Sequence, residues 1–567
     1  MSDKQIREHT AEEKMNAGSA WMSAASILSR VLGVIYIIPW MAWMGEPQVA
    51  NEANALFNIG YKWYAIFIAI AIAGVPGAIS KQIANYNARG EYWTARRLFK
   101  SGLILMAISG VVSAALLWIL APQLASNTPA RSLDYAVTVI RSLVPALAII
   151  PILSILRGFF QGHQDMKPSA ISQILEQLFR VIYMLVAVYI IRMTLNGSMV
   201  NAVAQSTFAA FIGAVVAIGS LGYYFIKNRS EYQIPANHVD TISVSTWSLL
   251  KEIIKVAIPF IIAGAAIEVS QLIDTNTFIP IMERVSDLSH SALINEYAVF
   301  SANANKLVTV VISLAIAISS VSIPVLSSTY TNELTHQVRK SRQEWPETIA
   351  LVTHNIQLFA IVMLPSALGM AAVARPLYTM IYPYDPSGTW FLQLSSIMAI
   401  AMGLFNVLVN NMQAMDYQKD AILGMVIGMV AKLALQYPLL ALFGTSGAMI
   451  SSIIGFGLMS VYYLIRIRVI LDFPYGQLLQ KLRTIILSAI IMAVVAYIAH
   501  WAVRLAIPDP NKIGSLISVA IVGIIGAWTY LLLGLRYQFL DLVLGNKAVM
   551  LRRLLGVTTY DEKYARR

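Results

Sequence analysis

The amino-acid sequence predicts an all-α polytopic membrane protein that crosses the bilayer about fourteen times. Two observations carry this prediction. Hydrophobic residues make up 57% of the 567 positions and charged residues only 12%, which is about half of the roughly 25% usual in globular domains. Apolar runs of about 20 residues, the length that a bilayer-spanning helix needs, recur along the whole chain. This pattern disfavours a soluble globule.

The first apolar run follows a charged segment, MSDKQIREHTAEEK. It is too long for the apolar region of a signal peptide and has no small-residue cleavage site, so we expect it to be retained as a helix. An even number of spans places both termini on the same side of the membrane. The predicted spans are residues 18–44, 55–80, 97–121, 134–156, 169–192, 201–226, 251–280, 298–324, 347–375, 388–411, 418–442, 446–467, 482–503 and 512–535.

The loops between these spans alternate in charge. One set of loops, together with both tails, contains 29 of the 41 Lys and Arg residues, Arg157 among them. The opposite set contains five, which are Arg131, Arg192, Arg284, Arg504 and Lys512. Because cytoplasmic loops are enriched in Lys and Arg, the crowded side and both termini are predicted to be cytoplasmic. The net charge of +12 is then mostly a topology signal and requires no nucleic-acid partner.

Besides the loop cations, seven Lys and Arg residues lie within the predicted spans: Arg30, Lys62, Arg141, Arg180, Lys306, Arg375 and Lys432. The clear intramembrane acids are fewer, namely Glu176, Glu268 and Asp274. A charge at mid-bilayer costs at least about 2.5 kcal/mol and normally faces protein or a water-filled cavity. The excess of cations is hard to explain by internal pairing alone. It indicates a hydrated, electropositive cavity suited to an anion.

Each cation also has a structural interpretation. Arg30, in the middle of its span, either lines the cavity or pairs with Asp274 or Glu268. Lys62 and Lys306 either line the cavity or extend to the interface, as long side chains do. Lys432 lies mid-span with no acid nearby in its own helix, which leaves a cavity role open. Arg141 and Arg375 lie near span ends, where interfacial anchoring is the better interpretation.

The acids leave two alternatives open. Glu176 and Arg180 are four residues apart with the acid first, the favourable order for an ion pair on a helix, so an internal salt bridge competes with substrate contact. Asp274 and Glu268 either bind a coupling cation or balance the charge of the arginines.

The chain contains a weak internal repeat. At an offset of 252 residues, Gln161 aligns with Gln413, Lys167 with Lys419 and Arg180 with Lys432; an offset of 244 aligns Lys62 with Lys306 and Arg30 with Asp274. Two similar halves with six helices each would be parallel repeats with the site between them. The predicted division is an N-lobe at 1–226, a cytoplasmic linker at 227–250, a C-lobe at 251–468, and two further spans with a tail at 469–567.

No enzyme motif is present. The sequence lacks a GxxxxGK[ST] phosphate loop, an HExxH motif and a GxSxG elbow, so no catalytic residue, metal site or cofactor is predicted. With no cysteine in the chain, disulfides and thiolate metal sites are excluded. No cytoplasmic loop is long enough for an ATPase domain. These observations favour a secondary transporter, driven by the membrane potential or by an ion gradient of Na⁺ or H⁺, over a pump or a channel.

Several segments resemble one known family. SRVLG at 29–33 resembles the first-helix motif of the MurJ (MviN) lipid II flippases. AGVPGAISKQIA at 73–84, ILRGFFQGHQDMKPSAISQILEQLFRV at 155–181 and LPSALGMAAVARPLYTMIY at 364–382 are similar to the Gram-positive MurJ and SpoVB-like group. This group belongs to the multidrug/oligosaccharidyl-lipid/polysaccharide (MOP) exporter superfamily. The resemblance covers essentially the whole chain.

The resemblance implies two six-helix lobes in a V, with two extra C-terminal helices that help to line a groove for a polyprenyl tail. It also implies cavity cations that meet the substrate's pyrophosphate. Arg30 occupies the first-helix arginine position, and Lys62 and Lys306 fit the positions of the arginines on helices two and eight. A second first-helix arginine of the Gram-negative pattern is Tyr36 here. Lys in place of Arg loses bidentate phosphate recognition, so the cation geometry of this chain differs from that pattern.

The resulting hypothesis is a lipid II flippase of a bacterial plasma membrane, monomeric, with membrane lipids and cell-wall synthesis proteins as partners. The substrate-binding candidates are Arg30, Lys62, Lys306, Arg180, Glu176 and Lys432, and the ion-coupling or charge-balancing candidates are Asp274 and Glu268. The alternatives are a flippase for another lipid-linked polysaccharide or teichoic precursor, a cation-coupled multidrug exporter, and a non-transporting scaffold. Cationic drugs would call for an acidic cavity, and a charged cavity argues against a scaffold.

Overall fold

Every regular element that the computed structural model describes is helical. The described residues are 35–72, 90–126, 132–163, 165–234, 265–337, 345–507 and 511–559, with isolated positions at 21–22, 25, 28–29, 32–33, 79–80, 82–83, 86–87, 245, 247–248 and 251. Twelve helices or pairs of helices in these ranges are long and apolar enough to span a bilayer. Each of the twelve overlaps one predicted span, which confirms the all-α polytopic fold. The predicted spans 18–44 and 251–280 lie partly outside the described residues.

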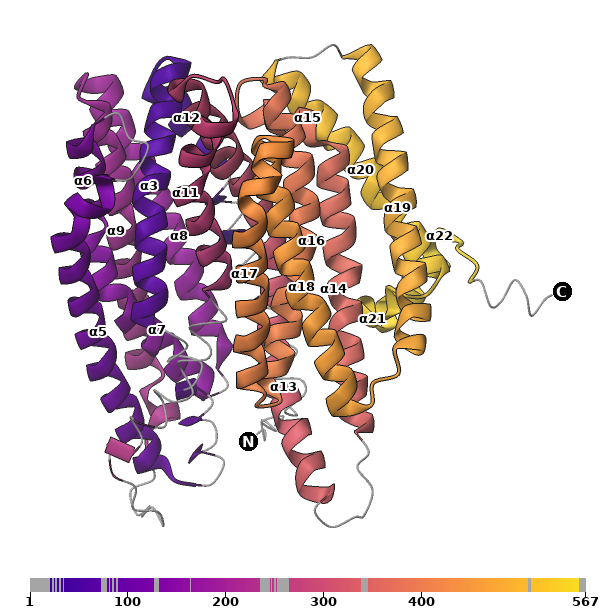
Figure 1. Ribbon diagram of the computed structural model, residues 1–567. Coiled ribbons are helices and arrows are strands. Elements are labelled where there is room, and N and C mark those ends of the chain that lie inside the picture. Colours follow the sequence, from indigo (N-terminus) through magenta and orange to yellow (C-terminus); the bar gives the residue numbers. More distant parts are fainter. Residues whose placement is uncertain are drawn as a thin grey trace, which may run out of the picture. The chain divides into compact units, whose positions relative to one another are not determined.

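The chain divides into two compact units, residues 1–268 and 269–567. The division falls inside one helix, whereas the predicted linker at 227–250 lies mostly outside the described residues. The N-terminal unit contains α2 (Ile37–Met44), α3 (Pro47–Ile72), α5 (Tyr92–Ser126), α6 (Leu133–Ser142), α7 (Val144–Gly162), α8 (Met166–Val188), a π-helical segment (Tyr189–Thr194), α9 (Met199–Lys227) and a 3₁₀ turn (Arg229–Tyr232). Within it, α8 packs along α9 and α5 along α7, as Figure 1 shows.

The described elements of the C-terminal unit are also all helices. Its elements are α11 (Ala266–Val285), α12 (His290–Ala298), a π-helical segment (Val299–Ala304), α13 (Asn305–Gln337), α14 (Pro346–Ala372), α15 (Ala374–Ile381), α16 (Pro386–Ala414), α17 (Gln418–Phe443), α18 (Thr445–Leu471), α19 (Tyr475–Ala506), α20 (Lys512–Arg536), α21 (Asp541–Leu544) and α22 (Asn546–Leu555). Helix α17 packs along α18, and α13, α14 and α18 pack against α16.

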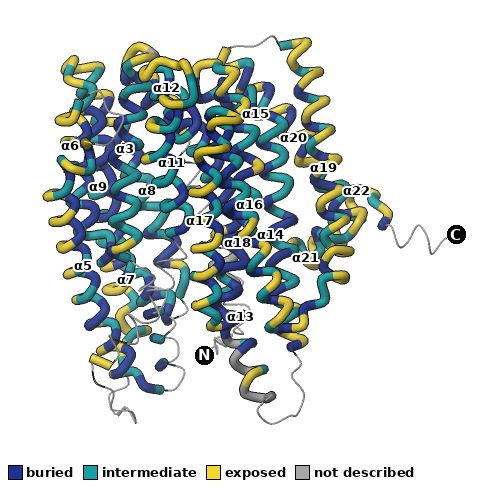
Figure 2. Tube along the Cα trace, in the orientation of Figure 1, coloured by how far each residue is buried: buried dark blue, intermediate teal, exposed yellow. Residues whose placement is uncertain are grey.

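The last two spans lie at the edge of this unit. Helix α19 packs on α14 and on α20. Only 17% of the most apolar stretch of α20 is buried, against 61% for α16, and Figure 2 shows the exposed residues along α19 and α20. Apolar side chains without protein neighbours are expected to contact lipid, so α19 and α20 are peripheral helices added to the bundle.

Local sequence signals set many helix ends. Ser198 accepts a hydrogen bond from the backbone N–H of Asn201 at the start of α9, and Asp385 and Asn511 cap α16 and α20 in the same way, as capping residues do. The predicted span at 134–156 is broken at Leu143. Pro145 has no N–H to continue the hydrogen-bond ladder there, so α6 ends and α7 begins.

Glycines let the two main helix pairs approach closely. A Cβ at Gly213 on α9 would lie 2.5 Å from the carbonyl oxygen of Glu176 and 3.1 Å from the Cβ of Arg180 on α8. In the other unit, a Cβ at Gly455 on α18 would lie 3.1 Å from the Cβ of Lys432 on α17. Small residues at helix contacts are typical of membrane proteins. The two cations aligned by the internal repeat are therefore each fixed beside a glycine of the next helix.

Candidate functional site

In the C-terminal unit, Asp274 and Lys432 form a buried ion pair. Helix α11 carries Asp274 and α17 carries Lys432. The Lys432 Nζ lies 2.7 Å from the Asp274 Oδ1, and the two side chains are 1% and 8% exposed. Lys432 has no acid nearby on its own helix, but the structure supplies one from a helix 158 residues earlier in the chain.

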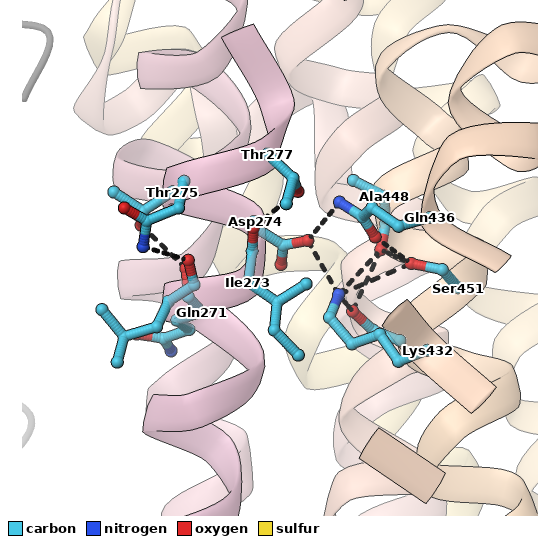
Figure 3. A network of polar contacts seen from close by, with 12 residues as sticks. Gln271, Ile273, Asp274, Thr275, Thr277, Lys432, Gln436, Ala448 and Ser451 are labelled. Atoms are coloured by element: carbon cyan, nitrogen blue, oxygen red, sulfur yellow. Dashed lines mark hydrogen bonds and ion pairs between the residues drawn. The ribbon is translucent and has the colours of Figure 1, made fainter. Parts of the chain in front are cut away.

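The pair sits in a set of polar groups drawn in Figure 3. The Lys432 Nζ also donates to the Ser452 Oγ at 2.7 Å, and the Gln436 Nε2 donates to the Asp274 Oδ1 at 2.9 Å. The Ser451 Oγ donates to the Gln436 Oε1 at 2.6 Å. Each charge thus has its counter-ion and a further neutral partner. A buried ion pair offsets its desolvation cost only when such hydrogen bonds complete it.

This arrangement places Asp274 opposite a cation. The sequence leaves open whether Asp274 binds a coupling cation or balances the charge of the arginines. In the structure its Oδ1 accepts from Lys432 and Gln436, so the cation beside it is a lysine and not an arginine. The sequence did not identify Gln436 or Ser452 as members of the site. One available signal was spacing, because Gln436 follows Lys432 by four residues and so lies on the same helix face.

In the N-terminal unit, Glu176 forms an ion pair with Arg157. The Arg157 Nη2 donates to the Glu176 Oε2 at 2.7 Å, and both side chains are 21% exposed. The Arg157 Nε donates to the Ser172 Oγ at 2.8 Å, which fixes the guanidinium between α7 and α8. The sequence places Arg157 in a loop, one residue after the predicted span at 134–156, but in the structure it lies within α7. The partner of Glu176 is therefore on the neighbouring helix and not Arg180 on its own helix.

Arg180 lies one turn further along α8 and contacts α3. Its Nη2 donates to the Tyr61 hydroxyl, and its guanidinium carbon lies 5.0 Å from the centre of the Tyr61 ring. A cation over an aromatic face is attracted by the ring quadrupole. Tyr61 precedes Lys62, so α3 brings both residues to this region of the unit. The contact between Arg180 and Tyr61 has no local sequence signal, because it joins residues 119 positions apart.

The remaining predicted residues are placed as follows. Lys62 is half-buried on α3, and Lys306 is half-buried at the second position of α13, directly after the π-helical segment. Glu268 is in the first turn of α11, and its Oε2 is buried without a described hydrogen-bond partner. Arg30 lies outside the described residues. The candidates thus fall in both units, and only Asp274 with Lys432 form a mutual contact among the interactions described above.

Among the residues that the structure describes, no group of three or more His, Cys, Asp or Glu side chains is positioned to hold a metal ion. The chemistry that these polar groups supply is instead electrostatic. Buried or half-buried cations lie on α3, α7, α8, α13 and α17, each within an apolar bundle. Such intramembrane charges mark ion or substrate pathways in membrane proteins.

Comparison with known proteins identifies the family. A family model described as polysaccharide biosynthesis protein matches residues 15–330. The chain is 31% identical over 547 residues to the lipid II flippase MurJ of Bacillus subtilis (strain 168), a match that covers 94% of this chain and 97% of the relative. The chain belongs to the MurJ family. The match covers nearly the whole length of both chains.

Solved structures agree on the fold. The lipid II flippase MurJ in an inward closed conformation gives a TM-score of 0.60 at 13% identity, covering 90% of this chain and 97% of that one. An outward-facing multidrug resistance MATE transporter of the MOP superfamily gives 0.61 at 15% identity, covering 81% and 96%. Membership of the MurJ family makes this chain a membrane transport protein and not an enzyme. The solved structures, at 13% and 15% identity, support the fold alone.

Proposed function

We propose that this protein is a lipid II flippase, which moves the undecaprenyl-pyrophosphate-linked peptidoglycan precursor from the inner to the outer leaflet of a bacterial plasma membrane. The observation that supports this most strongly is the 31% identity to Bacillus subtilis MurJ over 94% of the chain. A lipid-linked pyrophosphate needs cations in a wet cavity and an apolar surface for its tail. The intramembrane Lys and Arg residues, with the lipid-facing α19 and α20, are compatible with both needs.

The proposed orientation places both termini in the cytoplasm. It rests on the excess of Lys and Arg in one set of loops. In this orientation the headgroup enters from the cytoplasmic leaflet and leaves on the outer side by alternating access of the two lobes. Outward movement of an anion is favoured by an inside-negative potential, at about 2.3 kcal/mol per charge for each 100 mV. Na⁺ or H⁺ is the proposed coupling ion for the return step.

The proposed roles of the residues follow their surroundings. Arg30, Lys62 and Lys306 are the proposed pyrophosphate contacts, supported by their positions in the family pattern. Lys432 with Asp274 is proposed as a charge-balanced element that fixes α11 against α17, because both charges are already paired.

A second candidate is a flippase for another lipid-linked polysaccharide precursor. The match of residues 15–330 to the polysaccharide biosynthesis protein family model favours it. The two candidates share the pyrophosphate and the polyprenyl tail and differ in the sugars. Identifying the transported glycan therefore distinguishes the two candidate functions, whereas the cations of the site do not.

The test is lipid II exposure at the outer surface of cells depleted of their own flippase. The cells receive the wild-type protein or Arg30→Ala at equal membrane abundance. We expect the wild type to restore exposure and Arg30→Ala to fail. If the wild type is expressed and folded but restores only a different lipid-linked glycan, lipid II is the wrong cargo and the second candidate takes its place. Equal activity of Arg30→Ala would remove Arg30 from the site.

A further inference from the structure

A cavity of about 610 Å³ lies within the N-terminal unit, and none of its described lining residues belongs to the ion pairs described above. Its walls come from α5, α7, α9 and the segment at 229–234. This volume is in the range of small-molecule sites, roughly 300–1,000 Å³. All its walls belong to one compact unit. The cavity is therefore a property of this unit alone.

Most of the cavity wall is apolar and aromatic. Phe99 and Phe159 approach with ring centroids 4.7 Å apart, and Leu103, Leu156 and Ile218 extend the apolar surface toward the centre of the helices. Phe225 closes one side, and its ring is stacked on Tyr232 at 5.8 Å. An apolar chain would be removed from water along this whole surface.

The segment that covers the cavity is held in place by hydrogen bonds. The Tyr232 hydroxyl donates to the Asp165 Oδ2 at 2.8 Å, and the Tyr224 hydroxyl donates to the same oxygen at 3.0 Å. His163 lies beside Tyr232, with ring centroids 5.4 Å apart. Asp165 thus links the segment after α9 to the turn between α7 and α8. These hydrogen bonds hold the segment in position, so the cavity is preformed.

The rim of the cavity carries two exposed cations. Arg96 and Lys100 are four residues apart on α5 and so lie on one helix face. Arg96 also lies 5.9 Å from the ring of Trp93, which is 48% exposed. Exposed Trp beside cations near a helix start is typical of the membrane–water interface. One acid, Glu231, also lines the cavity and is exposed, which leaves the rim with a net positive charge.

We propose that this cavity binds one anionic phospholipid, with its phosphate at Arg96 and Lys100 and an acyl chain between Phe99, Phe159 and Phe225. An apolar interior directly below a cationic rim matches an amphiphile with an acidic headgroup better than a neutral lipid or a soluble anion. Arg96 lies in the predicted loop between the spans 55–80 and 97–121, which belongs to the set rich in Lys and Arg, and Lys100 follows in the first turn of the second span. Under the proposed orientation the lipid therefore comes from the cytoplasmic leaflet. Lys62 and Lys306 do not line this cavity, and lipid bound there would stabilise the packing of α5, α7 and α9.

Two glycines on α9 supply a matched test. Gly222 lines the cavity, Gly219 does not, and a Cβ at either position would meet no atom within 4 Å. Both are exposed. Gly222→Phe therefore adds a large side chain at a lining position where the Cβ meets no protein atom, and Gly219→Phe adds the same side chain one turn earlier, at a position that does not line the cavity. For the charges, the double variant Arg96→Gln/Lys100→Gln is compared with the double variant Lys167→Gln/Lys227→Gln. Lys167 and Lys227 are exposed and do not line the cavity.

The experiment is native mass spectrometry of the full-length purified protein, titrated separately with phosphatidylglycerol, phosphatidylcholine and inorganic phosphate. We expect one phosphatidylglycerol to bind at least tenfold more tightly than phosphatidylcholine. Gly222→Phe and the Arg96 and Lys100 double variant should each weaken that binding at least tenfold, while Gly219→Phe and the Lys167 and Lys227 double variant match the wild type.

Three results would overturn the proposal. One is unchanged phosphatidylglycerol affinity in Gly222→Phe, and another is equal affinity for phosphatidylcholine. The third is full displacement of the lipid by inorganic phosphate, which would make the rim a simple anion site. Should Gly222→Phe fail to fold, a photoactivatable phosphatidylglycerol on the wild type decides: crosslinks within residues 92–103, 156–163 and 218–234 support the site, and crosslinks only elsewhere refute it.

Discussion

Removal of Lys432 should destabilise the protein strongly, because it leaves the Asp274 carboxylate buried without its cation. Lys432→Met keeps most of the side-chain length and deletes the two bonds of 2.7 Å to the Asp274 Oδ1 and the Ser452 Oγ. Asp274 then retains one neutral donor, the Gln436 Nε2. Breaking a buried ion pair from one side costs about 3–5 kcal/mol. With the two side chains 1% and 8% exposed, solvent cannot screen the remaining charge, so the full range applies.

The double variant Asp274→Asn/Lys432→Met separates this pairing from a general packing defect. It removes both charges, and the introduced asparagine side chain still offers an acceptor to Gln436. Because residues in one hydrogen-bonded pair couple by about 0.5–3 kcal/mol, the double variant should recover at least about 1 kcal/mol relative to the sum of the single variants.

The assay is a reversible SDS titration of the purified protein in mixed micelles, followed by tryptophan fluorescence. Lys419→Met is the control, since Lys419 is exposed at the start of the same helix and surface changes usually stay within about 0.5 kcal/mol. A cost below about 1 kcal/mol for Lys432→Met, or strictly additive single variants, would show that the pair does not stabilise the unit and would refute the reasoning.

Three further predictions use other parts of the fold. A Cβ at Gly447 would lie 2.1 Å from a backbone oxygen, so Gly447→Ala should cost about 1–3 kcal/mol in the same titration, whereas Gly457→Ala on the same helix meets open space and should not destabilise. Glu176→Gln weakens a charge-assisted hydrogen bond to Arg157 and should cost about 1–3 kcal/mol. Burial lowers the pKa of His163, so the folded state binds fewer protons than the unfolded state. The melting temperature should therefore fall as pH drops through about 6.5. The variant His163→Gln should reduce that fall.

Each of these has a contrary result. Equal stability of the two alanine variants would show that the α17–α18 contact relaxes freely. An unchanged unfolding curve for Glu176→Gln would mean that solvent already screens the Arg157 pair. An identical pH dependence of melting in His163→Gln and the wild type would assign the acid sensitivity to other groups.

The helices were predictable because apolar length is a local property. Each of the twelve candidate spans overlaps a range expected from the sequence, and most of its residues need no distant partner to be recognised. The break at Leu143 is less visible in the sequence, which predicts one span at 134–156, whereas Pro145 separates α6 from α7. Some helices also extend past the predicted end of their span. Helix α13 continues to Gln337, whereas the predicted span ends at residue 324.

The polar partners were not predictable, because they join residues far apart in the chain. Lys432 has no acid nearby on its own helix, and its partner Asp274 comes from α11, 158 residues away. Glu176 had a plausible partner four residues away, yet it pairs with Arg157 across helices. A single sequence shows which residues are charged and buried. It does not show which of several opposite charges the bundle brings within hydrogen-bond distance.

The most direct test of the flippase proposal is transport by the purified protein in liposomes. Fluorescent lipid II is placed in the leaflet that corresponds to the cytoplasmic side, an inside-negative potential is imposed, and a membrane-impermeant quencher reports its arrival in the other leaflet. We expect the wild-type protein to move lipid II faster than empty liposomes and faster than liposomes containing Arg30→Ala. Lipid II that stays in its leaflet while the reconstituted protein remains folded would contradict the proposal.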